Sequence, residues 1–161
     1  REKHYLLATV HRAENTDDAG RLRKVLSAFS ELGETVLFPV HPRTRNVMEG
    51  LGVLPGPNVR LIDPVGYLDM VVLEQSARLI LTDSGGIQKE AYWLGVPCIT
   101  LREETEWVET VEAGWNVLAG VEPRRILGYV REFLPPPHRP SLYGTGGVSA
   151  RCVELLERTP A

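Results

Sequence analysis

Short apolar runs and amphipathic segments alternate along this chain. The runs lie at residues 5–10, 35–40, 59–62, 78–82, 96–101 and 116–118. After the first run, apolar side chains recur at helical spacing, at Leu22, Val25, Leu26, Phe29 and Leu32. Further helices are expected at residues 44–51, 67–76, 87–94, 123–133 and 148–158. Apolar strands joined by helices are typical of a parallel sheet buried on both faces. The pattern therefore predicts an α/β fold, a Rossmann-like open parallel sheet of about six strands with helices on both faces.

Local signals refine the expected element ends. Asp17 or Asp18 suits the N-cap of the first long helix, and Gly33 is expected to end that helix in the left-handed conformation. Pro39 has no N–H for a sheet ladder, so it should lie at the end of its strand or at an irregularity. The tail departs from the alternation, because a run of prolines is followed by a glycine-rich loop at residues 143–147.

Composition narrows the class of protein. The 161 residues suffice for one domain. A net charge of -3 gives no reason to expect a nucleic-acid partner.

Cys98 and Cys152 fit no metal-binding spacing, and Cys98 is expected to be a small buried hydrophobe. With no disulfide framework, membrane span or signal peptide in the sequence, a cytoplasmic location is expected. His4 and His138 are interpreted as surface residues.

The first residue is an arginine, and an apolar run follows almost at once. This beginning indicates a piece of a longer protein, although processing would produce the same appearance. About 200 further residues ahead of Arg1 are expected if the chain is one half of a two-domain enzyme.

The segment TDSGGIQKE, at residues 82–90, follows an apolar strand and opens a helix. Two adjacent glycines let an anion approach the first N–H groups of that helix, which have no partner within it. A diphosphate would fit there with the Ser84 hydroxyl as a further donor, and the Glu90 carboxylate would accept from two ribose hydroxyls. The same residues also suit a helix N-cap, a tight turn and a surface glutamate.

Two other loops after strands carry cationic side chains. In HRAEN, at residues 11–15, His11 and Arg12 suit an anionic oxygen, and His11 can exchange a proton near neutral pH. The alternative is a histidine bonded to local backbone and an arginine paired with Glu14. In HPRT, His41 and Arg43 lie on the same expected rim of the sheet, or else simply begin a capped helix.

The segment REETEWVE, at residues 102–109, is dense in acidic side chains, which argues against its lining a phosphate site. Arg102, Thr105 and Glu106 would instead contact sugar hydroxyls or close the cleft. A solvated acidic loop is the alternative.

Taken together, HRAEN, HPRT, TDSGGIQKE and REETEW resemble the non-hydrolysing UDP-N-acetylglucosamine 2-epimerase family in order and spacing. The resemblance extends to Tyr143-Gly144, similar to the family's YGDG segment. It covers only the family's C-terminal domain, so residues 1–161 are expected to be the nucleotide-binding half of a GT-B-type two-domain fold, without the N-terminal domain that carries the catalytic carboxylates.

The resemblance implies an activity. Such enzymes interconvert UDP-N-acetylglucosamine and UDP-N-acetylmannosamine by eliminating UDP and adding it back with C2 inverted, and they use no redox cofactor and no metal. The expected partners are these two nucleotide sugars, UDP, and the N-terminal domain of the same polypeptide. A homodimer is expected for the full-length protein, and the 161-residue chain alone is expected to be inactive.

The resemblance also assigns residues to the nucleotide. Ser84, Gly85 and Gly86 would hold the diphosphate, and Glu90 the ribose. His11 would contact the phosphate of the leaving UDP and is the catalytic candidate in this chain.

Other positions match the base and an activator. Backbone near Val65 and the side chain of Met70 match the positions that flank uracil. Arg12 and His41 match residues that help bind a second UDP-N-acetylglucosamine as an activator in bacterial members.

Four positions depart from the family pattern. Met70 replaces an aromatic residue found in some members, and Lys89 replaces a frequent acid. Trp107 stands where other members carry an arginine, which puts one phosphate contact in doubt. Thr145 replaces the aspartate of the tail motif.

Three alternative functions remain open at this point. A GT-B-type glycosyltransferase shares the diphosphate loop and the ribose glutamate, but the HRAEN and HPRT pair is not expected in one. A hydrolysing epimerase would release free N-acetylmannosamine and UDP. A stand-alone nucleotide-sugar sensor would need a native start codon near Arg1.

Overall fold

The computed structural model describes residues 5–144 and 146–158. His4 and Thr145 lie outside the described residues. The strands are β1 (Leu6–Thr9), β2 (Val36–Pro39), β3 (Val59–Ile62), β4 (Leu79–Thr82), β5 (Cys98–Thr100) and β6 (Asn116–Leu118). The helices are α1 (Ala13–Thr16), α2 (Ala19–Glu31), α3 (Pro42–Gly50), α4 (Tyr67–Ser76), α5 (Gly85–Leu94), α6 (Val108–Glu112), α7 (Pro123–Glu132) and α8 (Val148–Arg158).

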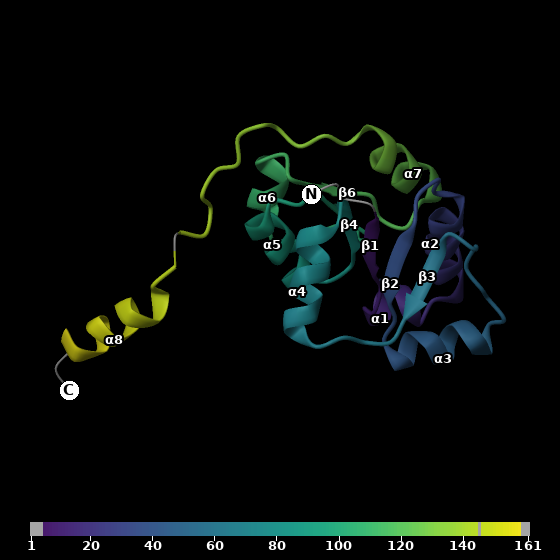
Figure 1. Ribbon diagram of the computed structural model, residues 1–161, viewed down its shortest axis with the longest axis horizontal. Coiled ribbons are helices and arrows are strands. Elements are labelled where there is room, and N and C mark those ends of the chain that lie inside the picture. Colours follow the sequence, from purple (N-terminus) through teal and green to yellow (C-terminus); the bar gives the residue numbers. More distant parts are fainter. Residues whose placement is uncertain (1–4, 145, 159–161) are drawn as a thin grey trace.

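The strands form one parallel sheet in the order β3-β2-β1-β4-β5-β6. The chain starts at β1, moves outward to β3 and then returns to place β4 on the other side of β1 (Figure 1). The strand order therefore reverses between β1 and β4, and ligands of such sheets bind at the carboxyl ends of strands at this kind of switch point. The predicted fold class, an open parallel sheet of six strands, is confirmed.

The two sheet faces bury alternate residues of the same strands. Leu6, Ala8 and Leu81 belong to a core cluster that includes side chains of α2 and α7. Leu7 and Ile80 belong to a second cluster with side chains of α4 and α5. Figure 1 shows these two helix pairs on opposite sides of the sheet, as the run of apolar strands predicts.

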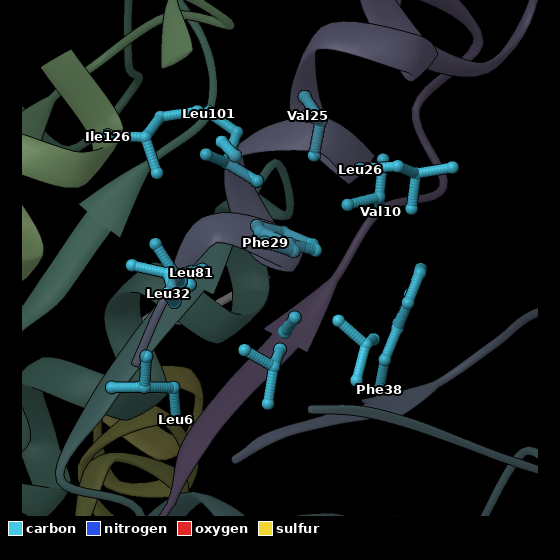
Figure 2. Packing of buried hydrophobic residues seen from close by; sticks show 14 of the residues in the cluster. Leu6, Val10, Val25, Leu26, Phe29, Leu32, Phe38, Leu81, Leu101 and Ile126 are labelled. Carbon is cyan, nitrogen blue, oxygen red and sulfur yellow. The ribbon is translucent and has the colours of Figure 1, made fainter. Parts of the chain in front are cut away.

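The larger cluster is built around two aromatic rings. Phe29 on α2 and Phe38 on β2 are fully buried, with ring centroids 6.2 Å apart and ring planes at 87°. In Figure 2 the side chains of α2 lie against those of β1 and β2, with Leu101 and Ile126 at the far side of the cluster. This edge-to-face packing joins α2 to the sheet.

Some local expectations are confirmed. Asp18 is the N-cap of α2, accepting from Gly20 N at 2.7 Å and Arg21 N at 3.0 Å. Pro39 is the last residue of β2. Cys98 is buried, and burial raises the pKa of its thiol to about 12. His138 is exposed.

The expectation that Gly33 ends α2 in the left-handed conformation is wrong. Leu32 leaves the helix with φ -70° and ψ 135°, and Gly33 has no positive φ. The reason is Asn58, whose Nδ2 lies 2.8 Å from Phe29 O, 2.9 Å from Leu32 O and 3.2 Å from Glu34 O. This amide satisfies the terminal carbonyls that a left-handed turn would otherwise satisfy.

Helix boundaries also differ from the expected ones. The third helix begins at Pro42 rather than at residue 44, because Pro is favoured at the first helical position. The helix after β4 begins at Gly85 rather than at residue 87. Short helices α1 and α6, within the HRAEN segment and after REETEW, are not expected from periodicity, since one turn is too short to show it.

The tail crosses α5 before reaching α8. Arg139 Nη1 donates to Tyr92 O and Trp93 O, at 2.5 and 3.0 Å, and the Tyr92 hydroxyl donates to Pro140 O. In Figure 1, α8 stands at the end of this tail, away from the sheet, and none of its residues is buried. Within residues 5–144 and 146–158, no helix is long and apolar enough to cross a membrane.

Replacement of Phe29 by alanine tests the core packing. Phe29→Ala is expected to lower the free energy of unfolding by about 3–5 kcal/mol, because it empties a fully buried ring site. Urea denaturation followed by circular dichroism measures this. Leu54→Ala is the control, since Leu54 is 83% exposed and its loss should cost less than about 0.5 kcal/mol. Equal costs for the two variants would contradict the core assignment.

Candidate functional site

A buried carboxylate joins the loops that follow β1 and β4. Asp83 is 0% exposed and accepts from the backbone N–H groups of His11, at 3.1 and 3.2 Å, and Arg12, at 3.1 Å. It also accepts from Asn15 Nδ2 at 3.1 Å, and the same nitrogen donates to Leu101 O at 3.0 Å. Asp83 therefore holds the HRAEN loop beside the start of α5.

The side chain of His11 faces the same carboxylate. Its Nδ1 lies 3.7 Å from Asp83 Oδ1, and 44% of the side chain is exposed. The imidazole therefore lies near a negative charge, and the exposed part of the ring is open to a ligand. Asp83 thus orients His11 at the switch point of the sheet.

The sharp bend before α5 is capped by its serine. The Ser84 N–H donates to Thr82 Oγ1 at 2.9 Å, and the Ser84 hydroxyl accepts from Ile87 N at 3.5 Å. Gly85 and Gly86 are the first two residues of this ten-residue helix. The unpaired N–H groups of a helix's first turn carry its partial positive charge, so this end attracts an anion.

Three side chains converge on the start of α5. A Cβ added at Gly85 would lie 3.3 Å from Glu106 Oε2, 3.3 Å from Trp107 Nε1 and 3.7 Å from Arg12 Nη2. A side chain at Gly85 would therefore crowd Glu106 and Trp107 and touch Arg12. Gly86 is exposed, and a Cβ there would meet only Ser84 Oγ, at 3.8 Å.

The REETEW loop lies against this helix start instead of standing free in solvent. Arg102 is only 7% exposed and donates to both Glu106 oxygens, at 2.9 and 3.0 Å. Thr105 donates to Gln88 Oε1 at 2.5 Å. A hydrogen bond from its own backbone N–H, and then the one from Arg102, lower the pKa of Glu106. An ionised carboxylate therefore lies next to the positive end of α5.

Arg12 does not pair with Glu14. The Glu14 carboxylate accepts from Arg21 Nη2 at 2.9 Å, and Arg12 Nη2 lies 4.0 Å from Glu106 Oε1. The alternative interpretation of HRAEN as a local Arg12–Glu14 pair is therefore wrong, because the backbone of Arg12 is fixed by Asp83. Its guanidinium, 45% exposed, is held at the start of α5.

A cavity of about 200 Å³ opens beside this helix start. It is lined by Thr9, Val10, His11, Pro39, His41, Pro64, Val65, Met70 and Ile87. Its walls combine apolar side chains with two imidazoles, which suits a flat heterocycle bound against a polar rim. The structure thus brings together His11, His41, Val65 and Met70 from four separate segments.

Arg43 and Glu90 lie elsewhere. Arg43 Nη2 is 2.6 and 2.8 Å from the oxygens of Asp17, so its side chain turns outward, and it does not line the cavity. His41 caps α3, its Nδ1 accepting from Arg43 N at 3.2 Å. Glu90 lines a second cavity, of about 210 Å³, with Tyr67, Val71, Trp93 and Leu94.

Sequence reasoning missed several residues of this site. Asp83 lies in TDSGGIQKE and Asn15 in HRAEN, but neither was assigned a role. The position of Asp83, between a buried strand and the start of a helix, was the feature that could have indicated its role in joining the loops. Glu74, which is buried on α4, gave no signal in the sequence, because an acidic side chain on a helix is ordinarily exposed. Among residues 5–144 and 146–158, no group of three His, Cys, Asp or Glu side chains could hold a metal ion.

The sheet, its switch point and the glycine-bearing helix start define a Rossmann-like α/β domain of the kind that makes up half of a GT-B-like protein. Comparison with protein families matches residues 1–157 to the family described as UDP-N-acetylglucosamine 2-epimerase. The chain belongs to this family.

Two relatives illustrate the similarity. A UDP-N-acetylglucosamine 2-epimerase homolog of Methanococcus maripaludis is 50% identical over 160 residues, which are 96% of this chain and 45% of that protein. A UDP-2,3-diacetamido-2,3-dideoxy-D-glucuronate 2-epimerase of Pseudomonas aeruginosa is 47% identical over 159 residues, 96% of this chain and 44% of that protein. The chain therefore spans less than half the length of the relatives it matches.

Solved structures of family members have the same fold as this chain. The UDP-GlcNAc 2-epimerase of Methanocaldococcus jannaschii, in complex with UDP-GlcNAc and UDP, superposes with a TM-score of 0.87 at 36% identity, over 97% of this chain and 45% of that one. A calicheamicin glycosyltransferase, at 21% identity and a TM-score of 0.57, shares the fold alone.

Replacement of Asp83 tests its role in holding the two loops together. Asp83→Ala is expected to lower the free energy of unfolding by about 3 kcal/mol, because two backbone N–H groups and an amide lose their acceptor. Thermal and urea denaturation measure this.

The control is Asp63→Asn, an aspartate whose side chain is 93% exposed and pairs with Arg45 on the surface. That change should alter stability by less than about 0.5 kcal/mol. An Asp83→Ala variant as stable as the control would show that the loops are held by other contacts.

Proposed function

We propose that this chain is the UDP-binding C-terminal domain of a UDP-N-acetylglucosamine 2-epimerase. The single observation that carries the proposal is the start of α5 at the sheet's switch point, where the first-turn N–H groups of Gly85 and Gly86 face outward beside the Ser84 hydroxyl. Residues 1–161 make up this domain, and the rest of the full-length protein supplies a second domain. The shared length with relatives, about 45%, supports that division.

In this proposal the nucleotide spans the switch point. The diphosphate binds the first turn of α5, with His11 Nε2 and the Ser84 hydroxyl as further contacts. Uracil enters the cavity beside Val65 and Met70. The ribose hydroxyls contact Glu90, one turn further along α5.

The remaining cationic side chains suit a second anionic ligand. Arg12 and His41 flank the same opening, with His41 lining the cavity and Arg12 near Gly85. They would bind a second UDP-N-acetylglucosamine as an activator, as the family resemblance suggests. Arg43 would contribute only after leaving Asp17, which makes it the weakest candidate of the set.

The reaction explains why the nucleotide must be held so firmly. The C2 proton of the sugar has no adjacent carbonyl and is not acidic, so inversion proceeds by elimination. The C1–O bond breaks, UDP departs with the electron pair, and a carboxylate of the other domain takes the C2 proton, leaving a glycal. UDP then returns to C1 as a proton is delivered to the opposite face of C2. The positive end of α5 and His11 stabilise the departing diphosphate.

A second substrate is also a candidate. The Pseudomonas aeruginosa relative, nearly as similar as the first, is named for UDP-2,3-diacetamido-2,3-dideoxy-D-glucuronate. Both substrates carry UDP and are inverted at C2, so the site in this chain serves either. They differ in the sugar, where the second has a carboxylate that a cationic contact would recognise.

A change at Gly86 tests the diphosphate site. Gly86→Val is expected to weaken UDP binding at least about 10-fold, because the added side chain stands where the phosphates approach the helix. Folding should be preserved, since a Cβ at Gly86 meets only Ser84 Oγ at 3.8 Å. Isothermal titration calorimetry with UDP and with uridine measures the effect, and uridine binding should change much less.

The matched control is Gly128→Val on α7, where a Cβ has no neighbour within 4 Å. It should bind UDP like the unmodified chain. Unchanged UDP affinity in Gly86→Val would place the diphosphate somewhere else and remove the basis of the proposal.

The reaction itself is tested with the full-length protein in D₂O. Epimerisation by elimination should place deuterium at C2 of both UDP-N-acetylglucosamine and its product, observed by proton NMR, whereas the 161-residue chain alone should give no turnover. A parallel assay with UDP-2,3-diacetamido-2,3-dideoxy-D-glucuronate identifies the preferred sugar.

Release of free sugar with UDP would instead indicate a hydrolysing epimerase, and transfer of the sugar to an acceptor would indicate a glycosyltransferase. Turnover by the 161-residue chain alone would contradict the proposal that the second domain supplies the catalytic carboxylates.

A further inference from the structure

Helix α4 buries an acid while two of its apolar side chains are exposed. Glu74 is 0% exposed and is the one buried residue among those of α4. Leu68 and Val72 on the same helix are 77% and 58% exposed. Neither oxygen of Glu74 has a hydrogen-bond donor among the described residues. A buried carboxylate without donors or a cation is costly, so a specific partner is expected.

That partner is another carboxyl group. Glu90, on the neighbouring α5, lies close enough to Glu74 to raise the pKa of that carboxyl group, and it lines one cavity with Tyr67 of α4. Two carboxylates share a hydrogen bond only if one of them carries a proton. Glu74 is the more deeply buried of the two, so it holds the proton and donates to Glu90.

The electrostatic surroundings agree with this assignment. Burial, and then the charge and hydrogen bond of Glu90, raise the pKa of Glu74 to about 8. The other titratable groups that interact with Glu74 are Tyr67, on its own helix, and Cys98, on β5. The pKa of each is raised, so both stay neutral near pH 7 and add no further negative charge, and neither side chain can carry a positive one.

We propose that protonated Glu74 is a positioning residue, which fixes the carboxylate of Glu90 so that it meets the ribose of the bound nucleotide. This inference rests on the proposed function, because Glu90 is the ribose contact there. The Glu74 hydroxyl and the Tyr67 hydroxyl each donate to Glu90, and its remaining lone pairs accept from two adjacent ribose hydroxyls. Glu74 itself does not touch the nucleotide.

The pairing makes two quantities depend on pH. The folded chain binds a proton at Glu74 that the unfolded chain releases from about pH 4.5, so stability falls as pH rises from about 4.5 to about 8. Above about pH 8, ionised Glu74 repels Glu90 instead of donating to it, and UDP affinity falls.

Two variants of Glu74 and one control distinguish the effect of its proton from the effect of its side-chain volume. Glu74→Gln keeps a donor at every pH. Its UDP affinity should stay within about 2-fold of the unmodified chain at pH 7 without falling above pH 8, and its melting temperature should be higher at pH 8. Glu74→Met removes the donor but fills the space, so it should fold stably and bind UDP about 5–10-fold more weakly. Glu49→Gln, an exposed glutamate on α3, is the control and should change nothing.

Carbon-13 NMR of the Glu74 carboxyl group, followed as a function of pH, tests the interaction between Glu74 and Glu90 without any ligand. Its titration midpoint should fall in Glu90→Gln, and a midpoint that does not move would overturn the pairing. UDP binding unaffected by Glu74→Met, or an alkaline loss of affinity retained in Glu74→Gln, would overturn the positioning role alone. An intact pairing in a chain that binds no UDP would overturn the proposed function and, with it, this role.

Discussion

The functional edge of this domain depends on one buried carboxylate. Asp83 accepts from two backbone N–H groups and one amide of the HRAEN loop, and it lies between strand β4 and the start of α5. It thereby fixes the position of His11 relative to Gly85 and Gly86, although these residues are about seventy positions apart in sequence. In the proposed function, His11 and the start of α5 act on one diphosphate, which requires a fixed separation between them, and this hydrogen-bonded acid fixes it.

Most of the fold was predictable because it follows from short-range patterns. Each strand is a continuous apolar run, since both sheet faces are covered, and α2 shows its apolar face at helical spacing. The predictions that were wrong concern features that depend on residues distant in the sequence. Gly33 looked like a helix terminator, but Asn58, which satisfies the end of α2, comes from a loop that no local pattern connects to it. Helices α1 and α6 are too short to have a readable period.

The site was predictable to the extent that parallel topology sets it. Loops after parallel strands meet at one edge, and this placed His11, His41 and the start of α5 together. Side-chain direction was not predictable. Arg43 lies on the expected rim yet pairs with Asp17, and Glu106, expected to avoid a phosphate site, lies beside Gly85 because buried Arg102 holds it there. The burial of Glu74 depends on how α4 meets α5, which its own sequence does not encode.

Two departures from the pattern that the family resemblance implies meet in a single contact. By that resemblance, Lys89 replaces a frequent acid, and Trp107 stands where other members carry an arginine. In this chain Lys89 Nζ lies 4.4 Å from the centre of a Trp107 ring and 4.6 Å from that of Tyr143. An acid and an arginine at these positions would attract each other as an ion pair, and a lysine and a tryptophan attract by cation–π interaction. Either change alone would leave an unpaired charge between α5 and the REETEW loop. The two together keep that loop attached to the helix, and they keep a positive charge within one turn of the helix start.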